Sequence, residues 1–290
     1  YKPVLNSLSV IISSIGAGIL LASFILHFIC AFSKVFVRKY NITKKDIFSA
    51  ALILFILNVL AVLFCKNNRQ IAYWDNAGFW LTSRNLAKVF REDGLIFVIK
   101  DIFSSVFTED YNFIIAVPTA VLAYIFGEGR MVYILGVVNF YFYPLIMFIY
   151  VFARRKSSCP LLCTLLTASA FPFLFFVSTQ GYIDAGAIVL AALALWLWYA
   201  DRHGQDISHS FIIGIVLAAA MVLRRWLVFF AIAYIAAFVV DSIVYKKKIS
   251  TIIWLFVSLA FGLLFLFQPY VTVKLMANYS GMYSAYDLGL

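Results

Sequence analysis

Long apolar segments separated by short polar ones run through this chain. The apolar segments are about 20 residues long, which is the length a helix needs to cross about 30 Å of hydrocarbon. A backbone that crosses a bilayer must satisfy its own hydrogen bonds, so each crossing segment should be a helix. The pattern predicts an all-α polytopic membrane protein with about eight transmembrane helices, at residues 8–32, 47–65, 131–153, 159–178, 183–200, 207–223, 226–243 and 251–268.

The composition supports a membrane protein. Of the 290 residues, 64% are hydrophobic and only 12% are charged, a balance that excludes an ordinary soluble domain. The net charge of +10 would suggest a nucleic-acid partner in a soluble protein. Here most basic residues lie in short loops between apolar segments, so the lipid bilayer is the expected partner and nucleic acid is not. The four cysteines show no metal-ligand spacing.

The basic loops predict which side of the membrane each segment faces. Lys and Arg concentrate after the first, third, fifth and seventh apolar segments, which assigns those loops to the cytoplasm. The polar segment 66–130 then lies outside. Residues 112–127 contain Pro118 and must not cross, because 131–153 already makes the one crossing that the charges require. We therefore expect a surface-lying or re-entrant helix there.

The segment 66–130 should form an outer-face loop of juxtamembrane helices within one transmembrane domain, residues 1–290. Residues 76–92 have an apolar and a polar face at helical spacing, which predicts an amphipathic helix lying apolar side down on the membrane. Gly94 should end this helix, and residues 95–107 form a second interfacial piece. The chain begins without Met and stops in a polar stretch, so we expect a C-terminal part beyond Leu290.

Four acids and a tyrosine in outer segments are candidates for chemistry. Asp75 precedes the amphipathic helix, so it is either an N-cap or a general base, and the two roles are compatible. Glu109, Asp110 and Tyr111 open the non-crossing segment, as a solvated turn or as a site for an acceptor or a divalent cation. Asp184 stands where two apolar segments meet, either paired with an arginine or functional, in the same acceptor- or metal-binding role as Glu109, Asp110 and Tyr111.

Two adjacent arginines, Arg224 and Arg225, interrupt apolar sequence near the outer surface. They could reach lipid phosphate, or they could grip the phosphate of a ligand through bidentate hydrogen bonds. Lys274 is a weaker candidate for the same task. The three histidines are isolated and none has zinc spacing.

The order of these features resembles the GT-C class of integral-membrane glycosyltransferases, in the branch of protein O-mannosyltransferases and lipid A aminoarabinose transferases. The resemblance covers roughly residues 47–240. It rests on Tyr73-Trp74-Asp75 after an apolar segment, then juxtamembrane helices, then Asp110-Tyr111-Asn112 leading to Pro118. It continues with a crossing segment that ends in Arg154-Arg155, with Gly181-Tyr182-Ile183-Asp184, and with Arg224-Arg225-Trp226.

The resemblance implies a cell-envelope enzyme of the plasma (inner) membrane with an extracytoplasmic active site. Such an enzyme moves a sugar, with inversion, from a polyprenyl-phosphate donor to a hydroxyl of a lipid, glycan or protein acceptor. Asp75 would be the base and Arg224 and Arg225 would grip the donor phosphate. No cofactor is required, although Glu109 and Asp110 allow a divalent cation. A transporter or lipid flippase is the alternative, and a non-catalytic relative is a third reading because Asn76 replaces a second acid that is frequent in this branch.

Overall fold

Helices make up most of the described part of a computed structural model of this protein, and no strand occurs there. The structure describes residues 23, 26, 27, 29–34, 42–67, 74–108, 113–201, 206–224 and 226–266. Their main elements are α2 (Lys44–Asn67), α3 (Trp74–Glu92), α4 (Leu95–Thr108), η2 (Phe113–Ala116), α5 (Val117–Phe126), α6 (Arg130–Val137), η3 (Val138–Phe142), α7 (Tyr143–Lys156), α8 (Pro160–Ala170), α9 (Pro172–Thr179), α10 (Asp184–Ala200), α11 (Ile207–Leu223), α12 (Leu227–Val244) and α13 (Ile249–Leu266).

Three helical segments are long and apolar enough to cross a membrane: α2, the continuous stretch from α6 through α7, and α12. The pair α8 and α9 would be a fourth, although it bends by 71°. The predicted number of about eight is not confirmed. The helices α10 and α11 have 17 residues each, about 25 Å of helix, which is less than the hydrocarbon thickness. Most of the first predicted segment, 8–32, lies outside the described residues.

The stretch from α6 through α7 contains a π-helical turn, η3, at its centre. Pro144 follows directly; it has no N–H to donate, and its ring crowds the preceding turn, which the wider π-turn relieves. The same turn carries Asn139, whose side-chain amide exchanges two hydrogen bonds with that of Asn58 on α2, at 2.8 and 2.9 Å. The exchange satisfies two amides at mid-depth and fixes the register of the two helices.

Small residues let α11 and α13 pack closely. A Cβ atom added at Gly214 would come within 2.0 Å of the Ser258 hydroxyl oxygen and 2.5 Å of the Leu255 carbonyl oxygen. A Cβ atom at Gly262 would come within 2.6 Å of that of Ala218. Each helix thus presents two small residues four positions apart to the other, a pattern typical of helices that pack inside membranes.

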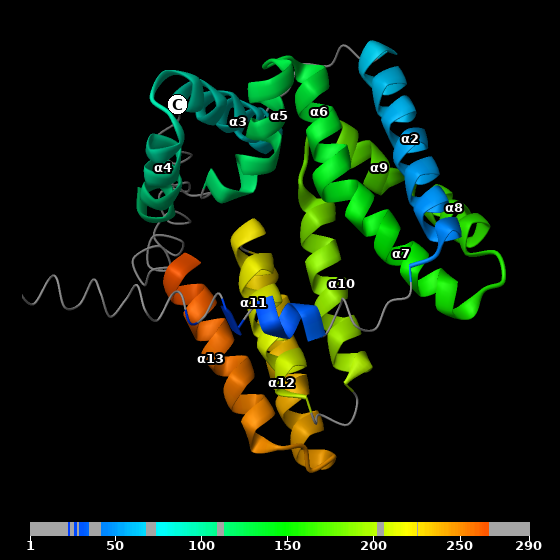
Figure 1. The fold of residues 1–290 in the computed structure, drawn as a ribbon, viewed down its shortest axis with the longest axis vertical. Helices are drawn as coiled ribbons and strands as arrows, with labels where there is room; N and C mark the ends of the chain where they lie inside the picture. Colours follow the sequence, from blue (N-terminus) through cyan, green and yellow to red (C-terminus); the bar gives the residue numbers. More distant parts are fainter. Residues whose placement is uncertain are drawn as a thin grey trace, which may run out of the picture.

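The helices α3, α4 and α5 gather at one end of the structure, where α6 begins, and the turn between α12 and α13 lies at the other end (Figure 1). Helix α3 is amphipathic as predicted, with Phe79 and Leu86 buried and Leu81 55% exposed. Its apolar face, however, packs against α5 and η2 instead of facing lipid. The helix α5, too short at ten residues to cross a bilayer, covers this face, so the expectation that it meets lipid is wrong. That α3 lies along the membrane surface stays a prediction.

Ion pairs mark the opposite end of the bundle. Asp46 at the start of α2 accepts from the Tyr150 hydroxyl at 3.0 Å and pairs with Arg154 at 3.1 Å, so α2 and α7 run antiparallel. Lys247 lies 2.7 Å from Asp241, which also accepts from the Trp198 indole nitrogen. Asp46 and Arg154, from two of the predicted cytoplasmic loops, therefore meet.

Candidate functional site

Asp184 and Arg224 form the central contact of the candidate site. Arg224 donates from Nε to Oδ1 at 2.9 Å and from a terminal nitrogen to Oδ2 at 2.7 Å, which is the bidentate geometry that guanidinium and carboxylate favour. Asp184 is the first residue of α10, and Arg224 caps the end of α11. The Arg224 side chain is 7% exposed and that of Asp184 27%. The arginine partner foreseen for Asp184 is therefore Arg224.

Arg224 also touches the helix that carries Asp75. Its guanidinium carbon lies 5.2 Å from the centre of the buried Phe79 ring on α3, within the range of a cation–π contact. Asp75 precedes Phe79 by four residues, which is about one helical turn. Helix α3 begins at Trp74, so Asp75 lies inside its first turn and not at the predicted N-cap position before the helix. An acid in a first turn is still stabilised by the helix dipole.

Tyr133 on α6 links the same elements from another direction. Its hydroxyl donates to the carbonyl oxygen of Gly181 at 2.8 Å, in the turn that leads into α10. Its ring stacks on that of Trp80, with centroids 6.3 Å apart and planes 22° apart. Gly181 has a φ of +96°, a left-handed conformation in which glycine is favoured. The starts of α6 and α10 and the first turns of α3 are thereby held together.

Glu128, in the turn between α5 and α6, holds the other half of α3. Its carboxylate accepts from Arg84 at 3.2 Å and from Arg91 at 2.7 Å, and its carbonyl oxygen accepts from the Trp80 indole at 3.2 Å. The hydrogen bond from Arg84 lowers the pKa of Glu128 most; burial acts in the opposite direction, and Arg91 lowers the pKa further. Inspection of the sequence did not single out this residue. The only sign of it in the sequence is that an acid stands between two glycines, Gly127 and Gly129.

The remaining predicted site residues lie outside the described part of the chain. For Asp75 only the backbone, within α3, is described. Within the described residues, no three His, Cys, Asp or Glu side chains gather as a metal site would require. The structure thus brings together Asp184, Arg224 and the beginning of α3 among the predicted features. The residues that fall in undescribed segments are Glu109, Asp110, Tyr111, Arg225 and Lys274.

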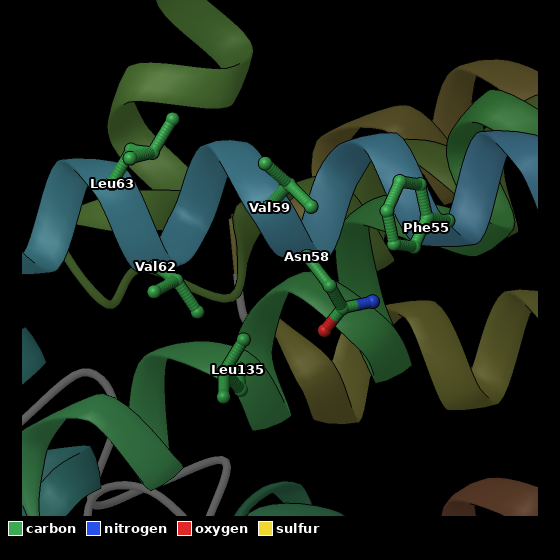
Figure 2. A pocket seen from close by; sticks show the side chains of 6 residues that line it. All are labelled: Phe55, Asn58, Val59, Val62, Leu63 and Leu135. Carbon is green, nitrogen blue, oxygen red and sulfur yellow. The ribbon is translucent and has the colours of Figure 1, made fainter.

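An open, mostly apolar groove of about 300 Å³ lies between α2 and α6. Figure 2 shows the side chains of α2 along one wall and Leu135 of α6 opposite, with the Asn58 amide between them. Its upper end, at Leu63, is four residues before the end of α2, about 6 Å along the helix. The groove therefore begins just inside the end of the bundle that carries α3. Its lining residues are Phe55, Asn58, Val59, Val62, Leu63 and Leu135.

Comparison of the chain with protein-family models, with curated proteins and with solved structures gave no match.

Proposed function

We propose that this protein is a membrane glycosyltransferase that moves a sugar from a polyprenyl-phosphate donor to an acceptor hydroxyl at the extracytoplasmic membrane interface. The observation that carries the proposal is the contact of Arg224 with Phe79, since it joins the ion pair of Asp184 to the helix that carries Asp75. A lipid-linked donor needs a site at one end of a helix bundle, where its phosphate meets water and its chain stays in hydrocarbon.

Asp75 is the general base in this proposal. A hydroxyl is a weak nucleophile, so the carboxylate takes its proton while the acceptor oxygen forms a bond to the anomeric carbon. The bond from that carbon to the phosphate oxygen breaks at the same time, and polyprenyl phosphate leaves with the electron pair. Attack from the face opposite the phosphate inverts the anomeric centre. Glu109, Asp110 and Tyr111 would bind the acceptor or a divalent cation.

Arg224 and Arg225 have different tasks in this proposal. The bidentate bond to Asp184 neutralises most of the charge of Arg224, so this pair alone attracts an anion weakly. Arg225, the next residue, adds a second positive charge in sequence, with Lys274 as a further donor. In this proposal Arg224 fixes the turn between α11 and α12, and Arg225 meets the phosphate.

The apolar groove between α2 and α6 would receive part of the polyprenyl chain. It begins near the end of α2 from which the chain continues towards Asp75, and all its lining residues except Asn58 are apolar. The side-chain amide of Asn58 is hydrogen-bonded to Asn139 and to the Leu54 carbonyl oxygen. It therefore has partners within the protein when a hydrocarbon chain lies beside it. Val59→Trp would fill the groove and should raise KM for a long-chain donor more than for a short-chain one.

The deciding experiment uses purified protein in lipid vesicles with a radiolabelled polyprenyl-phosphate sugar. Asp75→Asn should lower the transfer rate about 100-fold or more, the range that loss of a general base produces, while leaving the unfolding midpoint unchanged. Asp101→Asn, which alters another acid of the same outer segment, is the matched control and should keep full activity. Transfer at the wild-type rate by the Asp75→Asn protein would refute the role of Asp75.

The same vesicles separate a transferase from a flippase. A transferase releases polyprenyl phosphate and labels the acceptor, whereas a flippase moves the intact donor across the bilayer. Donor that changes leaflet without cleavage would overturn the proposed function.

A further inference from the structure

Glu128 contacts α3 at three points along one side of the helix. Trp80, Arg84 and Arg91 bond to its carbonyl and carboxylate oxygens, and Arg91 also donates to the Ala123 carbonyl oxygen at 2.8 Å. The contacts span eleven positions of α3, about 16 Å along the helix. A short turn thus determines the direction of the α3 axis as well as its position.

The turn that carries Glu128 is itself fixed. Gly127 adopts a φ of +97°, and its N–H donates to the Ala123 carbonyl oxygen, ending α5. Gly129 is the residue before α6. Glu128 therefore stands at a rigid joint between α5 and the long membrane segment that starts with α6, so its carboxylate ties α3 to that segment.

Asp75 lies five residues beyond Trp80, about 7 Å past the last of these contacts. At this end α3 is held by Phe79 beneath Arg224. Loss of the Glu128 carboxylate would remove the bond that Arg84 makes and one contact of Arg91, which keeps its hydrogen bond to the Ala123 carbonyl oxygen. The helix would then rotate about the contacts left at Phe79 and Trp80. The far end, at Glu92, moves most and Asp75 moves less, but a displacement of about 1 Å at a reacting group can cost about 100-fold in rate.

We propose that Glu128 is a positioning residue that fixes the angle of α3, the helix whose first turn carries Asp75 and whose Phe79 contacts Arg224. The expected effect on the transfer rate rests on the proposed function, whereas the orientation of α3 by Glu128 does not depend on it. Trp80, Arg84 and Arg91 are the groups on α3 through which it acts.

The kinetic test compares Glu128→Gln and Glu128→Ala with wild type. Gln keeps one oxygen acceptor and Ala keeps none, so kcat for sugar transfer should fall in that order, to a loss of about 10- to 100-fold for Ala. KM for the lipid donor should remain unchanged, since the donor does not contact Glu128. Glu92→Ala is the matched control. Glu92 is also on α3, and among the described residues its one ion pair is with the exposed Lys88, at 3.9 Å.

The geometric test measures distances between nitroxide labels by pulsed electron resonance. Cysteines are introduced at Asn85 on α3, away from the contacts of Phe79 and Trp80, and at Phe140 in η3, both exposed, in a chain whose four native cysteines are replaced by serine. Glu128→Ala should broaden the distance distribution, and the Glu92→Ala control should not.

An unchanged distribution in the Glu128→Ala protein would overturn the proposal whatever the activity. A broader distribution with wild-type kcat would also overturn it, because α3 would then move without affecting transfer. Absence of transfer in the wild-type protein would remove the proposed function instead, and the distance measurement would still decide whether Glu128 orients α3.

Discussion

The ion pair of Asp184 and Arg224 offers the sharpest test of the structure. We consider Asp184→Asn, which removes one charge at nearly the same volume, Arg224→Gln, which removes one charge and shortens the side chain, and the double variant that carries both changes. Both residues lie at helix ends, and the Phe79 ring packs against the guanidinium. The cost of each change depends on how well the charge left behind can reach water.

The two single variants should differ in stability. Breaking a fully buried ion pair costs about 3–5 kcal/mol, because the remaining charge stays desolvated. Asp184→Asn leaves the guanidinium, which is 7% exposed, so we expect a loss of about 2–4 kcal/mol. Arg224→Gln leaves a carboxylate that is 27% exposed and can hydrate, which lowers the expected loss to about 1–2 kcal/mol.

The assay is equilibrium unfolding of the purified protein in detergent micelles, followed by tryptophan fluorescence. The double variant should be more stable than the sum of the single losses predicts, with a coupling free energy of about 1–2 kcal/mol, since each single change strands a charge that the double variant lacks. Additive losses, or a larger loss for Arg224→Gln than for Asp184→Asn, would refute the assignment of a buried bidentate pair.

Three further predictions concern the packing and charge of other elements. Gly214→Ala should lower stability by about 1–3 kcal/mol, because its Cβ would overlap α13, whereas Gly78→Ala, with open space around it, should be neutral or stabilising. Asn58→Leu should cost about 1–2 kcal/mol by stranding the amide of Asn139 at mid-depth, and replacing both residues by Leu should recover part of that loss in thermal unfolding. Asp206 has its pKa lowered to about 2, since hydrogen bonds and nearby positive charges outweigh burial, which acts to raise it. The stabilisation that the Asp206 carboxylate provides is present at neutral pH and lost as pH falls from about 4 towards 2. Asp206→Asn should therefore make the unfolding midpoint less dependent on pH in that range.

Several local features followed from the sequence alone. The helical class, the membrane-length apolar segments, the amphipathic character of 76–92 and the start of a helix at Asp184 all rest on periodicity and composition, which act over short distances. Gly94 ends α3 with a φ of +90°, as expected for glycine after a helix. Leu81, an apolar residue on the polar side of this helix, is exposed.

Contacts between distant segments required the tertiary structure. Sequence placed Asp184 and Arg224 near one membrane surface, but their bidentate bond depends on the way α10 and α11 pack, which no local pattern encodes. The amphipathic stripe of α3 has the same sequence whether lipid or protein covers it, and only the position of α5 showed that protein does.

The number of crossings shows the same division. Hydropathy measures only how apolar a segment is. Whether the segment crosses a membrane also depends on the length and the bend of its helix, which are set by packing. The 71° bend between α8 and α9 arises where two helices meet at Phe171 and Pro172, and it leaves one predicted crossing in two pieces. Glu128 is the clearest case: its role comes from Arg84 and Arg91, which are distant in sequence and reach it only once α3 packs against α5.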